Sequence, residues 1–189
     1  MQSERTAADL DPLVRNWWLL AGRGGLAVLF GLVIAIWRTP LFEAVVVAFG
    51  TYAIVDGFVA IGLALRVSRA RVAGWPIALE GMVSVILGCL AFIWPFFPRR
   101  IIAVLATWGV ITGIFELVAA ARLPRRLAAH WLVGAGGVSS IFLAVVVLAL
   151  PRAGSDRVAL SLSAYAIVFG IVILMAALRV RRHLAPRGR

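Results

Sequence analysis

Long apolar stretches, separated by short polar connections, occupy most of the chain. The first, NWWLLAGRGGLAVLFGLVIAIWRTP from Asn16 to Pro40, has one arginine inside its apolar part. We predict six spans, at residues 17–37, 44–65, 75–94, 101–121, 131–150 and 158–178. Each is close to the roughly twenty residues that a helix needs to cross about 30 Å of hydrocarbon. The spans are predicted to be helices, because a backbone exposed to lipid has to satisfy its own hydrogen bonds and the runs are too long for barrel strands.

The same pattern recurs three times along the chain. A tryptophan opens each odd span, and each even span has an aromatic residue, a glycine five residues later and a closing arginine. The even spans read YAIVDGFVAIGLALR, WGVITGIFELVAAAR and YAIVFGIVILMAALR. The units cover about residues 17–66, 75–122 and 131–179, with a period of about 56 or 57 residues. Because a two-span unit returns to the side it left, the sequence predicts an all-α integral membrane protein, a pseudo-threefold bundle of three hairpins.

Composition agrees with a transmembrane domain over residues 17–179. The chain of 189 residues is 63% hydrophobic and 14% charged, which leaves too little polar surface for a soluble domain. Thirteen arginines flank the spans on the side of both termini and five lie on the other side, so the positive-inside rule places segments 1–16 and 180–189 in the cytoplasm. The net charge of +11 is therefore a topology signal, and no nucleic-acid partner is expected.

Two kinds of partner are expected besides the bilayer itself. Anionic lipid headgroups could contact Arg179, Arg181 and Arg182 at the end of the last span, which otherwise form a solvated topological anchor. Small residues four apart recur in register in the even spans and let helix backbones approach closely. These are Ala53 and Gly57, Gly109 and Gly113, and Ala166 and Gly170. We expect them to pack helices, either within one chain or between the chains of a homo-oligomer.

Ionisable residues within the spans are the candidates for chemistry. Arg23 and Glu80 occupy the same repeat position, about 7–8 Å inside the membrane at the rise of a helix, and Glu116 lies at about 9 Å from the same side. A lone charge at this depth costs at least a few kcal/mol, so we predict a buried ion-pair layer of Arg23, Glu80 and Glu116. Such a layer could serve only to fix which helix neighbours which, or it could be functional.

Asp56 is predicted to lie deeper, about 15 Å from the same side, with no basic residue at equal depth in any other span. The equivalent repeat positions hold Thr112 and Phe169, so the repeat does not require an acid here. An unpartnered carboxyl near the midplane is a candidate for proton exchange, and the alternative is a permanently neutral group bonded to a neighbouring helix. Tyr52, one turn earlier on the same face, is its expected neighbour.

The remaining motif search gives no site for an enzyme. The chain has no phosphate-binding glycine loop, no set of cysteines and histidines with metal spacing, and no nucleophile elbow. Cys89 is the single cysteine, which excludes a disulfide within the chain. We therefore expect no catalysis, no cofactor and no metal.

The repeated segments resemble the HdeD family of bacterial inner-membrane proteins, which are small six-span proteins built from an internal repeat. The resemblance extends over essentially the whole chain and includes the segments NWWLLAGRGGLAVLFGLVIAIW and EGMVSVILGCLAFIWP. It covers Arg23, Asp56, Gly57, Glu80, Gly81, Gly113 and Glu116. It implies a multi-pass protein of the bacterial inner membrane that is associated with acid resistance, and it supplies no catalytic residues.

Two functions remain open at this stage. In the first, the protein is a structural or pH-sensing membrane component for acid or envelope stress, in which protonation of buried carboxyls shifts helix packing. In the second, it is a channel or transporter for protons, ions or small solutes that uses Asp56 and the charged layer. The second would gain if hydroxyl residues faced a common cavity with Asp56, namely Ser84, Thr112, Ser140, Ser161 and Ser163.

Overall fold

The computed structural model describes residues 15–37, 42–67, 74–93, 98–123, 129–149 and 155–182. These contain six helices, each long and apolar enough to cross a membrane. The helices are α2 (Trp17–Ile36), α3 (Phe42–Val67), α4 (Gly74–Ile93), α5 (Pro98–Arg122), α6 (Ala129–Ala149) and α7 (Ser155–Arg182). The predicted six-helix class is therefore confirmed. The predicted terminal segments, 1–16 and 180–189, lie mostly outside the described residues.

The second helix of each repeat (α3, α5 and α7) is longer than the sequence predicts. The third span of this kind was predicted at 158–178, whereas α7 has 28 residues and continues to Arg182. Its last turn contains three arginines, and an arginine stem can lie along the apolar surface while its guanidinium reaches the headgroups. A search for apolar runs stops at the first charge, so it ends such a helix about one turn too early.

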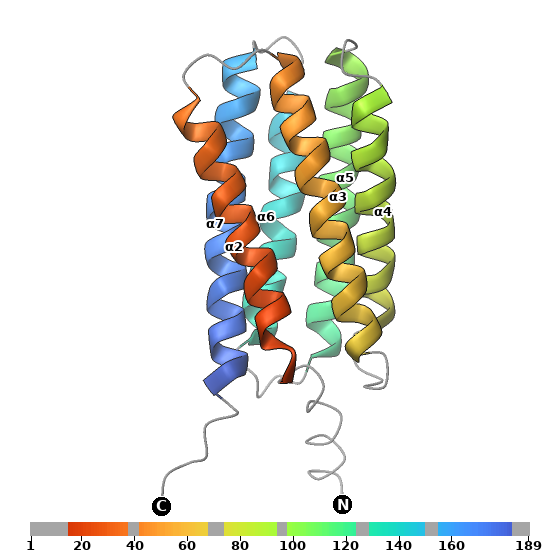
Figure 1. Cartoon of the computed structure of the whole chain (residues 1–189), viewed down its shortest axis with the longest axis vertical. Coiled ribbons are helices and arrows are strands. Elements are labelled where there is room, and N and C mark those ends of the chain that lie inside the picture. The colour runs from red at the N-terminus through yellow and green to blue at the C-terminus, as the bar shows by residue number, and fades with distance from the viewer. Residues whose placement is uncertain are drawn as a thin grey trace, which may run out of the picture.

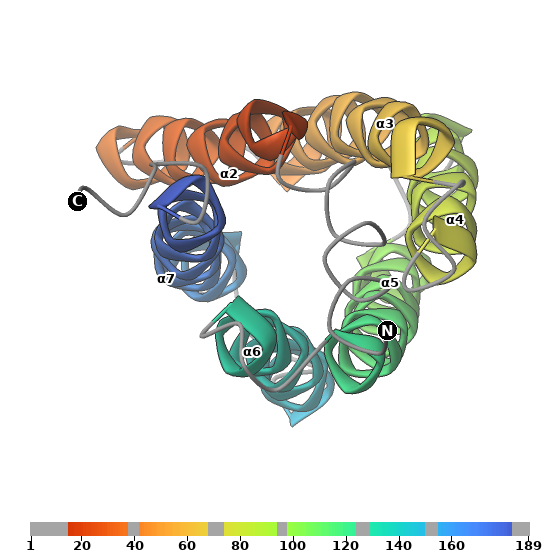
Figure 2. The same cartoon turned by 90° about the horizontal axis from the view of Figure 1, so that it is seen from below.

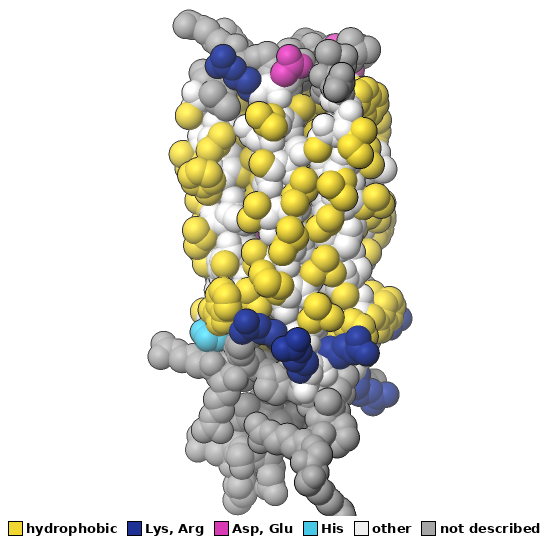
Figure 3. Space-filling view, turned by 90° about the vertical axis from the view of Figure 1, so that its left-hand side faces the viewer, with side chains coloured by type: hydrophobic (Ala, Val, Ile, Leu, Met, Phe, Trp, Pro, Cys, Tyr) yellow, Lys and Arg dark blue, Asp and Glu magenta, His cyan; other side chains and the backbone are white. Residues whose placement is uncertain are grey.

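The six helices stand side by side in a closed ring, in chain order (Figures 1 and 2). The beginning of α2 and the end of α7 lie at the same end of the ring, here named the terminal end, and the opposite end is the distal end. On the face in Figure 3, hydrophobic side chains are spread over the middle of the bundle and arginines lie in a row at the terminal end, here named the arginine belt. Among the described residues, the exposed arginines of this end are Arg15, Arg66, Arg122, Arg179, Arg181 and Arg182.

The closest helix contacts join neighbouring repeats. A Cβ built on Gly57 of α3 would lie 2.6 Å from the carbonyl oxygen of Gly81 on α4, and one built on Gly113 of α5 would lie 2.6 Å from that of Gly137 on α6. Such distances exclude any side chain, so only glycine permits this approach. The second helix of a repeat therefore packs tightly on the first helix of the next repeat.

The same contact closes the ring between the first and last helices. A Cβ on Gly170 of α7 would lie 2.5 Å from the carbonyl oxygen of Gly24 on α2. The first residue of each predicted small-residue pair lies one turn earlier. Ala53 and Ala166 are 0% and 1% exposed, and a Cβ on Gly109 would lie 2.8 Å from the Ser140 carbonyl oxygen. The predicted small-residue pairs thus lie at three equivalent interfaces within one chain.

We predict that Gly24→Ala opens this closure and that Gly25→Ala does not. A Cβ at Gly24 would lie 2.8 Å from backbone atoms of α7, whereas a Cβ at Gly25 meets nothing within 4 Å. Alanine also favours a helix over glycine by about 1 kcal/mol, so Gly25→Ala should be neutral or slightly stabilising. Thermal unfolding of the purified variants in one detergent measures both effects. Equal melting temperatures for the two variants would contradict the close contact of α2 with α7.

Candidate functional site

A buried arginine connects the first three helices. Arg23 of α2 donates from Nε to Asp56 Oδ1 and from Nη2 to Asp56 Oδ2, both at 2.9 Å, so that it holds the carboxylate of α3 in a bidentate pair. The same Nη2 donates to Glu80 Oε1 of α4 at 2.5 Å. All three residues are buried, at 4%, 1% and 2% exposed. One guanidinium therefore fixes three helices in one arrangement.

The prediction that Asp56 lacks a basic partner is wrong. The predicted depths are positions of Cα atoms along the helix axis, and at the level of Cα atoms Arg23 lies much nearer the terminal end than Asp56. An arginine side chain is long enough to span the difference, because its guanidinium stands several bonds beyond Cα. Tyr52, the predicted neighbour of Asp56, lies close enough to interact with it electrostatically, but its buried hydroxyl has no hydrogen-bond partner among the described residues.

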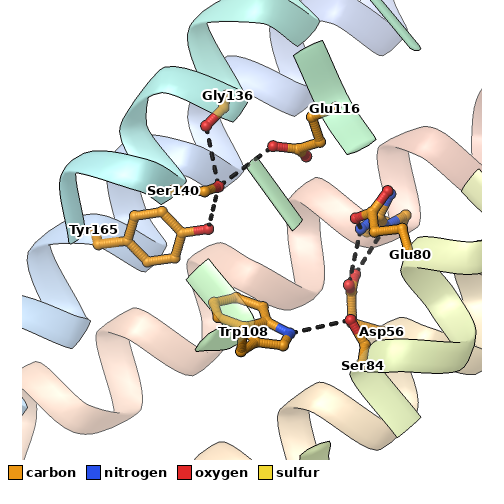
Figure 4. A network of polar contacts seen from close by, with 9 residues as sticks. Asp56, Glu80, Ser84, Trp108, Glu116, Gly136, Ser140 and Tyr165 are labelled. Carbon is orange, nitrogen blue, oxygen red and sulfur yellow. Dashed lines mark hydrogen bonds and ion pairs between the residues drawn. The ribbon is translucent and has the colours of Figure 1, made fainter. Parts of the chain in front are cut away.

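Glu116 of α5 is near this group but is not joined to Arg23 by an ion pair. Its Oε2 accepts a hydrogen bond from Ser140 Oγ of α6 at 3.3 Å, and Ser140 Oγ lies 2.9 Å from the hydroxyl of Tyr165 on α7 (Figure 4). Ser140 also contacts the carbonyl oxygen of Gly136 at 3.1 Å. The predicted triad is therefore incomplete at Glu116. The other carboxyl oxygen, Oε1, is buried and has no hydrogen-bond partner among the described residues.

Charge is unbalanced in this region, here named the carboxyl cluster and defined as Arg23, Asp56, Glu80 and Glu116. Arg23 is the only buried basic residue among those that the structure describes, and it faces three buried carboxyl groups. If all were ionised, the cluster would have a net charge of −2 inside an apolar bundle. Such a charge is costly in a low dielectric, so protons have to compensate it where no other cation is present.

An aromatic layer lies on the distal side of the cluster. Tyr52, Trp108 and Tyr165 occupy equivalent repeat positions on α3, α5 and α7, and all are buried. The ring centroids of Tyr52 and Trp108 are 6.2 Å apart and those of Trp108 and Tyr165 are 6.1 Å apart, both edge to face. Three phenylalanines pack against these rings: Phe30, Phe49 and Phe169. Contacting rings thus pack across the interior of the bundle at this level.

A repeated hydrogen bond supports the aromatic layer in two of the three repeats. Trp108 Nε1 donates to Ser84 Oγ at 3.0 Å, and the Tyr165 hydroxyl lies 2.9 Å from Ser140 Oγ. Ser84 and Ser140 both stand nine residues after the tryptophan that opens their repeat, and the first repeat has Ala27 at this position. This difference explains why the Tyr52 hydroxyl is left without a partner.

A second repeated contact lies at the terminal end. The closing arginine of each repeat stacks over the opening tryptophan of the same repeat, with distances of 5.1, 5.1 and 5.4 Å from Cζ to the ring centroid. The pairs are Arg66 with Trp18, Arg122 with Trp75 and Arg179 with Trp131. This contact joins the two helices of one hairpin and gives a structural reason for the recurring tryptophan and arginine.

Three stretches of the chain, residues 22–93, 79–148 and 135–188, match the family described as a short repeat of unknown function (DUF308). The chain belongs to this family. The first two DUF308 matches each extend over three consecutive helices. The first shares part of α4 with the second, and the second shares part of α6 with the third. Each of these two matches therefore includes one glycine interface between repeats. No curated protein matches the chain, and no solved structure does.

We predict that Ala27→Ser stabilises the protein by giving the Tyr52 hydroxyl the partner that its equivalents have. A buried hydrogen bond contributes about 1 kcal/mol, and relief of an unsatisfied hydroxyl adds to this. The matched control is Ala91→Ser, because both alanines are 0% exposed. Thermal unfolding should give a higher melting temperature for Ala27→Ser and an unchanged or lower one for Ala91→Ser. A lower value for both would show that the first repeat cannot accept the bond.

Proposed function

We propose that the protein is a non-enzymatic membrane component that responds to acid through protonation of the carboxyl cluster. The observation that carries this proposal is the ratio of three buried carboxyls to one buried guanidinium. Like charges at close range in a low dielectric cannot all remain ionised, so the cluster holds protons whose number changes with pH. Because Arg23 already binds Asp56 and Glu80, Glu116 is the group we assign to the most easily exchanged proton.

Acid would act on helix packing through the bonds of Arg23. Protonation of Asp56 or Glu80 weakens a charge-assisted bond between α2 and its neighbours, because a neutral carboxyl attracts the guanidinium less than a carboxylate does. These bonds connect helices of the first and second repeats, which otherwise meet at the glycine interface of α3 with α4. A change in the number of bound protons therefore changes the strength of the contacts that hold the first two repeats together.

The arrangement of polar groups favours sensing over conduction. Ser163 donates to the Gly31 carbonyl oxygen and Ser161 to the Arg157 carbonyl oxygen, so both hydroxyls serve the helix backbone. Ser84 is bonded to Trp108 of the aromatic layer. Three of the hydroxyl residues that could have lined a path with Asp56 are therefore used in packing. Of the other two, Ser140 bonds to Glu116, and the buried Thr112 hydroxyl has no hydrogen-bond partner among the described residues.

The cellular setting follows from the resemblance to the HdeD family and from the arginine belt. We assign the protein to the bacterial inner membrane with the terminal end in the cytoplasm, because the belt is at that end and the positive-inside rule governs such loops. A role in acid or envelope stress accords with a proton-binding cluster. The exposure of Arg179, Arg181 and Arg182 at this end supports the proposal that they contact anionic headgroups.

We predict that Arg23→Gln destabilises the protein at neutral pH and much less in acid. Loss of the guanidinium leaves three buried carboxyls without a cation, a change that typically costs about 3–5 kcal/mol. At low pH the carboxyls are neutral, so the missing cation matters less and the difference from the native protein should shrink. Unfolding midpoints across pH measure this. The control Arg100→Gln changes an exposed arginine and should show no such dependence.

Glu116→Gln distinguishes proton binding from a purely structural role of the cluster. Glutamine has the shape of the protonated acid and no charge, so we expect native or higher stability at neutral pH, together with the loss of about one proton from the measured uptake on acidification. Proton uptake by the purified protein in weakly buffered detergent solution gives this number. Unchanged uptake in a folded Glu116→Gln protein would remove Glu116 from the proposed role.

Flux into liposomes tests the alternative of transport. We expect proton and ion flux to equal that of empty liposomes at neutral and acidic pH, because contacting aromatic rings pack across the bundle interior beside the cluster. Flux above this level that Asp56→Asn abolishes would overturn the sensing proposal and place Asp56 on a conducting path. Flux that Asp56→Asn leaves intact would also contradict the closed axis, but would locate the path elsewhere.

A further inference from the structure

A small internal cavity of about 40 Å³ lies against the carboxyl cluster. Arg23, Glu80 and Glu116 form its polar wall. Its other wall is apolar and comes mainly from residues closer to the terminal end than the cluster: Leu20, Leu63, Ile77, Ala119, Leu123, Val133 and Val180. Leu123 directly follows the last residue of α5, and Val180 lies in the last turn of α7. The cavity therefore extends from the carboxyls toward the terminal end of the bundle.

An unpaired atom is found at this cavity. Glu116 is 2% exposed, lines the cavity, and has one carboxyl oxygen, Oε1, without a hydrogen-bond partner. Buried polar atoms are almost always satisfied by protein or by ordered water. One water molecule needs about 10–15 Å³ of cavity volume, so this cavity has room for about two or three water molecules. Water next to Arg23, Glu80 and Glu116 would also find the several polar partners that it requires.

The opposite side of the cluster is built differently. Tyr52 stands one turn before Asp56 on α3, and Trp108 stands two turns before Glu116 on α5, so the aromatic layer is on the distal side. Its rings contact one another across three helices. The groups that face the cluster from the last two helices are uncharged: Ser140 from α6 and the Tyr165 hydroxyl from α7. The cluster thus has a cavity on one side and packed rings on the other.

We propose that this cavity is a hydration site whose water supplies protons to Glu116 and Glu80 from the terminal end only. This inference rests on the proposed acid response and adds its direction: the carboxyl cluster equilibrates with the pH at the arginine-rich end and is shielded from the pH at the distal end. A proton delivered by hydronium to Glu116 Oε1 leaves water behind, so the step needs no other reactant.

Infrared spectroscopy of oriented proteoliposomes tests the direction. Vesicles with outward C-termini are captured on a resin through a C-terminal tag, and the unbound fraction supplies the opposite orientation. The external solution is acidified while the lumen is strongly buffered at neutral pH. The carboxylic acid C=O band that Glu116→Gln removes identifies the cluster. We expect this band to appear at once in vesicles whose terminal end faces out and to be delayed in the others until the lumen acidifies.

Each outcome decides one of the two claims. Equally rapid appearance of the band in both orientations, or earlier appearance from the distal side, would overturn the one-sided hydration site and leave the acid response intact. Absence of the band in both orientations, in protein shown to be folded, would overturn the acid response and the inference with it. The two failures are therefore distinguishable in one experiment.

A variant that fills the cavity gives an independent measurement. Ala119→Val adds two methyl groups to the cavity wall and leaves every carboxyl group of the cluster in the sequence. We expect it to slow the appearance of the band severalfold, because the added volume displaces water from the cavity. Ala106→Val is the matched control, since Ala106 is on the same helix, is also 5% exposed and lies toward the distal end. Equal rates in folded Ala119→Val and Ala106→Val proteins would contradict a role of this cavity in proton supply.

Discussion

Buried charges in an apolar bundle have to be neutralised by other buried groups. Among the described residues, Arg23 is the buried cation that neutralises the carboxylates. Its guanidinium bonds to carboxyls from two other helices, so the position of α2 relative to α3 and α4 is fixed by electrostatics as well as by packing. Because solvent cannot replace a lost partner at this depth, any change in the charge of one member is felt by the others. The same property that makes the cluster rigid makes it responsive to protons.

Two kinds of contact hold the ring together, one within each repeat and one between repeats. Within each repeat, a stacked arginine and tryptophan at the terminal end join the two helices of the hairpin, as Arg66 and Trp18 do. Between repeats, glycines such as Gly57 and Gly81 let the backbones touch, where dispersion forces act over a long stretch of helix. Aliphatic side chains and aromatic rings then pack in the interior around the carboxyl cluster.

The sequence predicted the parts of this structure that depend on composition and on repetition. Six apolar runs of sufficient length predict six helices in any arrangement, and their period predicts three units. The order of contacts was not predictable in the same way, because small residues such as Gly57 and Gly24 mark a close approach without naming the partner helix. Depth along a helix correctly placed Arg23 beside Glu80, but it failed for Asp56, since it measures Cα positions and not the reach of a side chain. The missing partner of Tyr52 could have been found by aligning Ala27 with Ser84 and Ser140.

The ring closes on itself through the same glycine contact that joins its consecutive repeats, which means that three separate hairpins could in principle assemble the same ring as a symmetric trimer. Such a trimer would repeat every residue three times, so one repeat position could not hold Arg23 in one hairpin and Glu80 in the next. Joining the repeats in one chain lets each copy differ from the others. The unequal cluster of Arg23, Asp56, Glu80 and Glu116 therefore depends on broken symmetry, while the glycines and tryptophans at equivalent positions keep the threefold contacts.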